Sequence, residues 1–529
     1  MNMLTPKEQL QVSTIQLRLP LEVGVKIDKN DPVVSFKKVM EGVNVRKYLK
    51  RSSQDPRGRD GYDPEVLLKI VLFAYMNNVR STRKIEQLCR NDIRFMYLSE
   101  EITPSHMTID NFMNKYLTEN IEDIFNEITA FIIEEQKIDI RTVFIDGTKI
   151  EAFPNKYTWV WKKACTTSRD RKFKELKTYF QKINNTALYM GQAEYPVQDT
   201  YSIEILEGIT AEWQKEMERQ GIQPVSGKGK HKTALQRNLD YLTKVTAKLK
   251  EYAEKISVCG EGRNSYSKTD LDATFMRMKT DYMGNTALLP AYNWQLATAG
   301  EVILYGLTSQ SASDSRCLIP LMEKHHRIFG EYPQCAVADA GYGNQETYQY
   351  CEKNGIGKYM KFASWERETH DDKFHNDPFR SRNFTIDEEG HPVCPGGKRF
   401  IKLYDKAIKG NADKRTEEVY ECENCEGCPL RGQCHKGEKN RRININRQLT
   451  RYHEEVIENL ASEKGIQLRM IRSSMAEGTF GIIKADYKFN RLTRVSLKKV
   501  NMEFYLIMAG FNLMKYHNLK HRIKPEEMN

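Results

Sequence analysis

Hydrophobic residues recur at helical spacing over most of the first 140 residues. Apolar side chains fall on successive turns of Pro64–Tyr75, and Asp63 directly before this stretch is a typical N-cap. Ser81 begins a second helical segment, and a turn at Thr103 leads into a third. Because arginines and lysines accompany these short helices, we predict an N-terminal all-helical DNA-binding domain. A helical domain with a solvated basic face is the alternative.

The pattern changes to that of buried strands after residue 140. Arg141–Asp146 is a β-branched and aromatic run that ends in an acid, and Cys335–Asp339 is a second short strand with the same ending. Between them, Tyr292–Thr298 and Val302–Thr308 have the pattern of a hairpin. A helix follows the hairpin at Leu318–Phe329. After the second acid come a helix at Glu346–Lys353 and a strand at Tyr359–Phe362. This order predicts an α/β sheet.

Two further regions are predicted to be helical. Residues 165–257 carry apolar side chains in steps of three and four, as in a helical hairpin, with a basic loop at Gly227. Near the C-terminus, Glu454–Lys484 is a helix broken near Gly465, and a last helix runs from Lys498 to about Tyr516. The apolar density of the last helix predicts that it packs on the core.

Composition narrows the class of protein. The chain has 529 residues, 40% hydrophobic and 29% charged, which excludes a mostly disordered or collagen-like chain and predicts several domains. No apolar run approaches the roughly 18 residues that a membrane span needs, and the N-terminus lacks an apolar signal-peptide core. We therefore expect a cytoplasmic protein without a membrane segment. The net charge of +11 fits a polyanionic partner but is weak evidence alone.

Three carboxylates are candidates for metal chemistry. Asp146 and Asp339 each end a predicted strand, and Glu477 lies within Arg472–Lys484. Acids at strand ends of an α/β sheet point into the crevice where ligands bind. Magnesium prefers oxygen ligands, and two such ions can bind both the attacking and the leaving oxygen of a phosphoryl transfer. Taken singly, each acid is equally well a cap or a surface residue.

The residues around these acids resemble the motifs of bacterial insertion-sequence DDE transposases, in the same order. Phe144–Ala152 resembles the first-aspartate motif, and Ala291–Thr298 resembles the second-strand motif. Ala338–Asn344 resembles the second-aspartate motif, and Arg472–Lys484 resembles the glutamate-helix motif. The resemblance spans about residues 60 to 520, and it is to the branch with an N-terminal helical domain and a late cysteine-rich stretch.

The resemblance implies an α/β fold with a ribonuclease-H-like catalytic core and three additions: an N-terminal all-helical domain, a helical insert and a small cysteine-rich insert. The implied domains run in chain order: 1–140 helical and DNA-binding, 141–154 core, 155–270 helical insert, 271–378 core, 379–450 cysteine-rich insert, 451–520 core with the glutamate helix, and 521–529 tail.

The implied activity is metal-dependent cleavage at the ends of a mobile element, followed by joining of the 3′-hydroxyl to target DNA. Asp146, Asp339 and Glu477 would hold Mg²⁺ or Mn²⁺. The partners would be double-stranded DNA, as terminal inverted repeats and target, and a second copy of the chain, at the nucleoid. Two alternatives stay open: a DNA-binding regulator without catalysis, and a ribonuclease-H-like nuclease that cannot join strands.

Several side chains near these motifs are candidates for DNA contact. Some related transposases place an arginine four residues before the glutamate and a lysine seven after it; here Lys484 fits, but Arg472 is offset by one and Ser473 fills its slot. Trp294 is a candidate for stacking on a base, with a core role as the alternative. The remaining candidates for DNA contact are Lys149, Tyr342, Arg491 and Arg494.

The cysteines give a separate signal. Five of the 11 lie in one stretch: Cys394, Cys422, Cys425, Cys428 and Cys434. Thiols of a cytoplasmic chain stay reduced, so this cluster indicates metal ligands before disulfides. Paired Cys-x2-Cys spacings favour a structural zinc site that uses four of the five; an iron–sulfur cluster and no metal are the alternatives.

Overall fold

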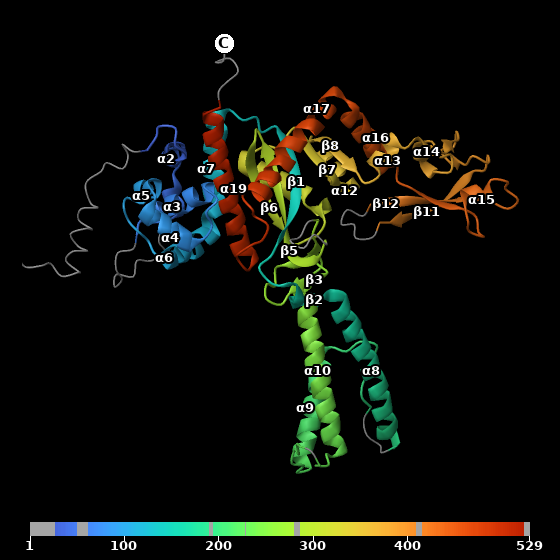
Figure 1. Cartoon of the computed structure of the whole chain (residues 1–529). Helices are drawn as coiled ribbons and strands as arrows, with labels where there is room; N and C mark the ends of the chain where they lie inside the picture. Colours follow the sequence, from blue (N-terminus) through green and yellow to red (C-terminus); the bar gives the residue numbers. More distant parts are fainter. Residues whose placement is uncertain are drawn as a thin grey trace, which may run out of the picture.

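The computed structural model describes residues 27–49, 62–189, 194–227, 229–279, 286–408 and 415–522. Much of the predicted tail at 521–529 and parts of the predicted domain at 1–140 lie outside these residues. Figure 1 shows a helical N-terminal region, a central mixed sheet, a long helical arm and a peripheral segment rich in strands. Among the described residues no helix combines the length and the apolar character that a membrane crossing requires.

The N-terminal region is helical, as predicted. Asp63 accepts a hydrogen bond from the Glu65 amide and so caps helix α3, which begins at Pro64. Ser81 precedes the next helix but makes no side-chain capping bond. The helices of this region are α2 (Pro32–Gly42), η2 (Val45–Tyr48), α3 (Pro64–Met76), α4 (Thr82–Asn91), α5 (Ile93–Leu98), α6 (His106–Phe112), η3 (Met113–Leu117) and α7 (Thr118–Gln136).

The central sheet is mixed. Its strands are β1 (Thr142–Glu151), β4 (Thr274–Arg277), β5 (Leu288–Ala299), β6 (Val302–Ser309), β7 (Cys335–Gly343) and β8 (Gly357–Phe362). β1 pairs antiparallel with β5 and parallel with β7; β5 also pairs antiparallel with β4 and β6, and β7 pairs parallel with β8. The short elements between these strands are η5 (Asp314–Arg316), α11 (Leu318–Phe329) and α12 (Gln345–Lys353).

Two strands run further than the sequence predicts. β1 was expected to end at Asp146, and the ending Asp-Gly resembles a turn. The strand instead continues to Glu151, because β5 supplies partners as far as the pair Glu151 and Ala291. β7 likewise continues beyond Asp339 to Gly343. The expectation that these acids end their strands is therefore wrong, and both lie inside a strand.

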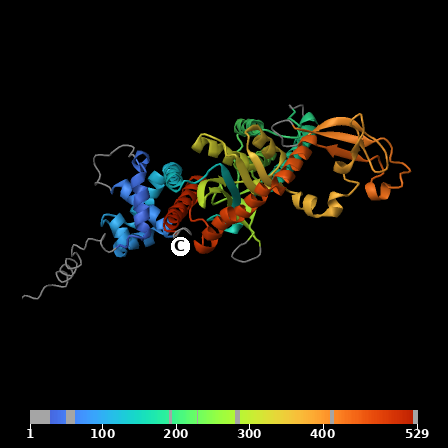
Figure 2. The same ribbon diagram turned by 90° about the horizontal axis from the view of Figure 1, so that it is seen from above.

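The last helix, α19 (Leu497–Lys520), joins the N-terminal helices to the sheet. It contacts α2, α3 and α7 on one side and β6 on the other, and Figure 2 shows it between the two regions. Asn512 of this buried helix donates a hydrogen bond to the Ile303 carbonyl and accepts one from the Ile303 amide. The prediction that this helix packs on the core is confirmed.

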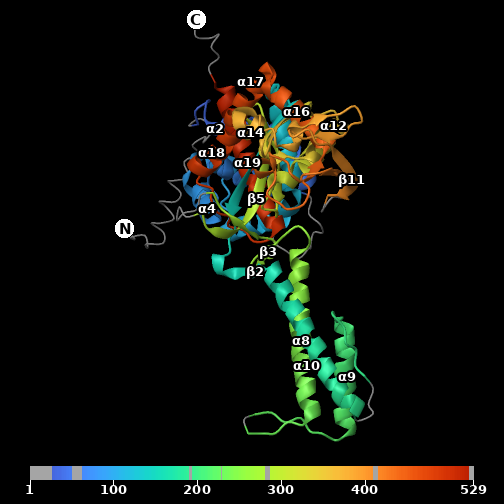
Figure 3. The same ribbon diagram turned by 90° about the vertical axis from the view of Figure 1, so that its right-hand side faces the viewer.

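A helical arm leaves the sheet between β1 and β4. A turn of 3-10 helix, η4 (Lys156–Thr158), leads into a two-stranded ribbon of β2 (Trp159–Trp161) and β3 (Ser265–Ser267) at the base of the arm. Three helices extend from the base: α8 (Lys162–Tyr189), α9 (Ile203–Arg219) and α10 (Ala234–Cys259). Figure 3 shows them projecting away from the sheet. Leu242 and Leu249, two of the regularly spaced apolar side chains of α10, are buried against side chains of α8 and α9.

The segment after β8 carries the clustered cysteines. It contains the small helices α13 (Trp365–His370), α14 (Asp372–His375), η6 (Ser381–Asn383) and α15 (Arg431–Cys434). Its strands form a hairpin of β9 (Thr385–Ile386) with β10 (Pro392–Val393), and a sheet of β11 (Phe400–Ala407), β12 (Thr416–Cys422) and β13 (Arg442–Ile445).

The chain returns to the central sheet through a bent helix, as predicted. α16 (Arg447–Ala461) ends at Ser462, whose hydroxyl accepts from the Gly465 amide and caps α17 (Glu463–Arg472). Two π-turns then flank α18 (Gly478–Gly481): η7 (Ser473–Glu477) and η8 (Ile482–Asp486).

Candidate active site

Asp146 and Asp339 lie on neighbouring strands of the central sheet. The parallel ladder of β1 and β7 pairs Phe144 with Val337, so the two aspartates follow two residues later at equivalent positions. The amide of Gly341 donates to Asp339 Oδ1 at 2.8 Å and fixes the rotamer of this carboxyl group. The sheet therefore places both acids side by side.

Glu477 reaches the same place from the bent helix. It ends the π-turn η7, which contacts β1 and β5. Ala476, the preceding residue, is buried in a cluster with Phe144 of β1 and Val337 of β7. Because Ala476 packs on the residues that precede the two aspartates, its neighbour Glu477 lies close to them.

The pKa of Asp146 is sensitive to the charges of the other two acids. Burial raises the pKa of Asp146 to about 6, while the Gly147 amide and the Arg472 guanidinium lower it, and the charges of Asp339 and Glu477 raise it further. Asp146, Asp339 and Glu477 thus lie on elements that pack against one another.

Glu477 is engaged by its own helix. Arg472 Nη2 donates to Glu477 Oε1 at 2.5 Å, and the Ser473 hydroxyl donates to Oε2 at 3.2 Å. In this arrangement, the described parts of the chain contain no group of three or more His, Cys, Asp or Glu side chains that could hold a metal ion. Asp146 and Asp339 nevertheless offer the hard oxygen ligands that magnesium prefers.

The π-turn explains the offset of Arg472. In η7 the Gly478 amide bonds to the Ser473 carbonyl, five residues earlier, whereas an α-helix bonds four residues back. The turn therefore takes up one extra residue. As a result Arg472, five residues before Glu477, still reaches its carboxylate.

Lys149 lies on β1, and Lys484 lies beside this strand. The Lys484 ammonium donates to the Thr148 hydroxyl and, at 3.5 Å, to the Lys149 carbonyl. Burial lowers the pKa of Lys484, the Lys279 charge lowers it further, and the charge of Asp146 raises it. Lys149 itself donates to the Arg277 carbonyl at 3.2 Å. Both predicted basic residues thus lie near the strand that carries Asp146.

Two predicted DNA contacts are wrong because the side chains are buried. Trp294 is 1% exposed and stacks on Phe504 with ring centroids 4.3 Å apart, so it belongs to the core. Tyr342 is 0% exposed, and its hydroxyl donates to Gln295. Neither ring has a free face for a base or a phosphate.

The two arginines that follow the bent helix have protein partners. Arg491 is exposed, pairs with Glu151 at 3.4 Å and donates to the Phe153 carbonyl at 2.7 Å. Arg494 pairs with Asp110 of α6 at 2.7 Å and so links the C-terminal segment to the N-terminal helices. A DNA contact by Arg494 would have to compete with this ion pair.

The sequence analysis did not single out a polar group beside the aspartates. Asn293 and Gln295 are buried on β5, and both donate to Asp314 at the start of η5. The available signal was two amides at alternating positions of an apolar strand, which face the same side of the sheet.

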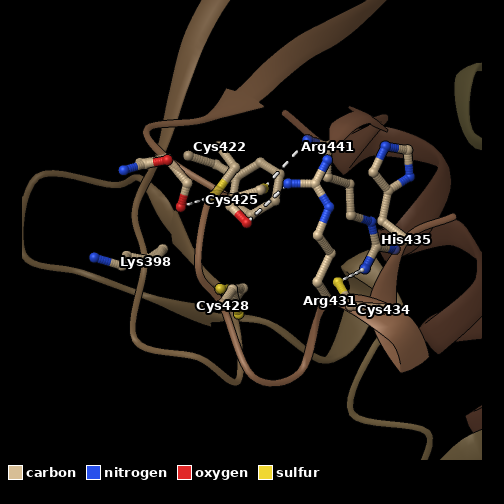
Figure 4. A pocket seen from close by; sticks show the side chains of 11 residues that line it. Lys398, Cys422, Cys425, Cys428, Arg431, Cys434, His435 and Arg441 are labelled. Carbon is tan, nitrogen blue, oxygen red and sulfur yellow. Dashed lines mark hydrogen bonds between the residues drawn. The ribbon is translucent and has the colours of Figure 1, made fainter. Parts of the chain in front are cut away.

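The clustered cysteines face one small pocket. Figure 4 shows this pocket, which is lined by all five thiols together with Phe400 and Arg441. The Arg441 guanidinium donates to Cys434 Sγ at 2.9 Å, and the Arg441 amide donates to Cys425 Sγ at 3.4 Å. Burial, followed by the neighbouring Cys425 thiol, raises the pKa of Cys422 to about 12. All five cysteines are free of disulfides.

Two segments of the chain match known families. The family described as transposase DDE domain matches residues 393–517, which include the clustered cysteines and Glu477. The family described as transposase domain (DUF772) matches residues 21–115, which cover most of the N-terminal helices. Neither the curated proteins nor the solved structures gave a match. The two family matches support an insertion-sequence DDE transposase.

Proposed function

We propose that this transposase binds the terminal inverted repeats of its mobile element, cleaves at the ends and joins the 3′-hydroxyl to target DNA. The observation that carries the proposal is the β1–β7 pairing, which brings Asp146 and Asp339 to equivalent positions, together with the packing of Ala476, the neighbour of Glu477, on the same two strands. The order and direction of strands β6, β5, β1, β7 and β8 support a ribonuclease-H-like core. In that core the acids of β1 and β7 face the substrate.

The acids would hold Mg²⁺ or Mn²⁺, the ions that DDE transposases generally use. When bound, such ions stabilise the attacking and leaving oxygens of phosphoryl transfer. In this proposal Asp146 and Asp339 bind the cation, and Glu477 joins them when its carboxylate leaves Arg472. Arg472, Lys484 and Lys149 then provide positive charge for the DNA backbone.

The proposed domains keep the boundaries expected from the sequence. Residues 1–140 would bind DNA through the N-terminal helices, and residues 141–154, 271–378 and 451–520 would form the catalytic core. The arm within 155–270 and the cysteine-rich segment within 379–450 would be inserts. We propose further that the protein works as a homodimer on DNA at the nucleoid, because two element ends must be brought together.

The test is cleavage of DNA that carries the element's own ends. The variants Asp146→Asn, Asp339→Asn and Glu477→Gln should each abolish magnesium-dependent cleavage, keep end binding and unfold at no lower temperature than the wild type. Asp139→Asn is a matched control, since Asp139 pairs with Arg141 before β1 begins. Unchanged cleavage in any of the three variants would remove that residue from the site.

The same assay separates the alternatives. A regulator binds the ends and never cuts them with either metal. A nuclease cuts the ends but leaves pre-cleaved ends unjoined in a strand-transfer reaction. Light scattering of the end complex tests the dimer: one chain on one end as the sole species would contradict it.

We propose that four of the clustered cysteines hold a structural zinc ion: Cys394, Cys422, Cys425 and Cys428. A Cβ atom at Gly396 would lie 3.4 Å from Cys428 Sγ and 3.7 Å from Cys394 Sγ, so these two thiols flank one point. They face a cavity of ≈ 20 Å³, room for about one water-sized sphere. Cys434 is left out because its thiol accepts from the charged Arg441 guanidinium at 2.9 Å, whereas Cys425 accepts only from the Arg441 backbone amide at 3.4 Å. Zinc would close the pocket once the thiols turn toward it.

Metal analysis of the purified full-length chain tests this site. We expect about one zinc per chain, loss of most of it in Cys428→Ser, and retention in the matched variant Cys434→Ser. Absence of zinc from the wild type, or iron in its place, would overturn the assignment. Equal loss in the two variants would overturn the exclusion of Cys434.

A further inference from the structure

A fourth carboxylate, Asp314, lies beside Asp339. It begins the turn η5, which contacts β7. A Cβ atom added at Gly341 would lie 3.5 Å from Asp314 Oδ2 and 3.0 Å from Asp339 Oδ1. The two carboxylates therefore lie near the same point of β7.

Buried amides fix the orientation of Asp314. Its Oδ1 accepts from Asn293 Nδ2 and from Gln295 Nε2, each at 2.7 Å. Asn293 is 1% exposed and Gln295 is 0% exposed, so these donors are shielded from solvent. Hydrogen bonds from two buried amides to one oxygen hold a carboxylate in one rotamer and leave its other oxygen directed at Gly341.

The same amides reach the strand that carries Asp146. Gln295 pairs with Gly147 across the β5–β1 ladder, and a Cβ atom at position 147 would lie 2.1 Å from Gln295 Nε2. Glycine after Asp146 is therefore what lets the Gln295 side chain cross β1. Gln295 also accepts from the Tyr342 hydroxyl on β7. One chain of hydrogen bonds thus runs from β7 through β5 to η5.

We propose that Asp314 is a positioning residue of the active site, which sets the spacing of Asp146 and Asp339 through Gln295 and adds a negative charge that strengthens cation binding there. This inference rests on the proposed function, because it concerns the metal of that same site. Asp314 is not assigned contact with DNA or with the reacting atoms.

The variant Asp314→Asn removes the charge and keeps the size of the side chain. Removing one full charge near a divalent cation in a partly buried site should raise the half-saturating Mn²⁺ concentration about tenfold. The measurement is a Mn²⁺ titration of the full-length, DNA-free protein, in which electron paramagnetic resonance monitors the free Mn²⁺. Asp314→Glu, which keeps the charge, should recover most of the affinity, and Asp139→Asn should bind like the wild type.

Thermal unfolding of the metal-free proteins separates positioning from support of the fold. Loss of a charge that repels Asp339 should leave the unfolding midpoint of Asp314→Asn at or above that of the wild type. A lower midpoint with unchanged Mn²⁺ affinity would overturn the proposal and leave Asp314 a structural residue.

The failure of this inference and that of the proposed function are distinguishable. If the wild type binds Mn²⁺ and cleaves ends while Asp314→Asn has the same affinity, only the role of Asp314 is overturned. If the wild type neither binds Mn²⁺ nor cleaves ends, the proposed metal chemistry fails, and the role of Asp314 fails with it.

Discussion

A single side chain at the site, that of Asp146, lowers the stability of the folded protein at neutral pH. Asp146 is partly buried beside two other acids, and its pKa is raised to about 6. In the unfolded chain the same group would have the ordinary value of 3.8. At neutral pH the metal-free protein therefore holds a carboxylate that is less stable in the folded state than in the unfolded one.

The raised pKa of Asp146 predicts the direction in which the stability of the protein changes with pH. Between pH 4 and pH 6 the folded state binds more protons than the unfolded state, so stability falls as pH rises through this window. Asp146→Asn should consequently raise the free energy of unfolding of the metal-free protein by about 1–3 kcal/mol at pH 7.5 and change it little at pH 4. Chemical denaturation at the two pH values measures the difference.

Asp139→Asn supplies the opposite sign. Hydrogen bonds from Arg141 lower the pKa of Asp139 to about 2, so its charge stabilises the fold at neutral pH. This variant should be slightly less stable than the wild type at pH 7.5. An Asp146→Asn variant that is also less stable at pH 7.5 would contradict the account of Asp146.

Candidate site residues were predictable where the side chain itself has the chemistry that the reaction requires. The acids Asp146, Asp339 and Glu477 could be chosen from their motifs, because few other roles require that order. Trp294 and Tyr342 could not be placed, since an aromatic ring beside a motif packs in the core as readily as on DNA. Asp314 was missed because its partners on β5 become visible only in the folded sheet.

At the scale of elements, the bent helix sets the position of Glu477. Gly465 lies at the bend, and a Cβ atom there would lie 2.0 Å from the Asn459 carbonyl oxygen. This contact is with backbone, which cannot move aside as a flexible side chain can. The angle between α16 and α17 therefore depends on a residue without a side chain.

Gly465→Ala should destabilise the protein by about 2 kcal/mol or more and reduce end cleavage, because the bend must open. Gly481→Ala is the matched control: it lies in α18, and a Cβ atom there meets nothing within 4 Å. That variant should be neutral or more stable by up to about 1 kcal/mol. Thermal unfolding of both variants checks the contrast, and equal effects would contradict the steric explanation.

Element types were predictable from periodicity, and element ends less so. Leu318–Phe329 is a helix with the predicted bounds, and the hairpin of β5 and β6 lies where expected. β1 was predicted too short because Gly147 resembles a turn residue, whereas the glycine makes room for the Gln295 side chain. The π-turn at Ser473–Glu477 has no sequence signal that periodicity could register.

At the scale of the whole molecule, long-range packing brings distant segments together. Residues of β1, β7 and the bent helix meet although the arm and the cysteine-rich segment separate them in the sequence. The order of elements predicted an α/β sheet, but the pairing of β1 between β5 and β7 follows from the three-dimensional topology. The hydrophobic pattern alone did not predict this pairing.

The ribbon at the base of the arm has a consequence for how such a chain diversifies. Trp161 and Ser265 are paired partners of the β2–β3 ladder, so the polypeptide departs and comes back at neighbouring points. The helices α8, α9 and α10 thereby form an inserted unit with its own apolar core. Lineages could lengthen, shorten or exchange this unit while the strands that carry the acids keep their registration.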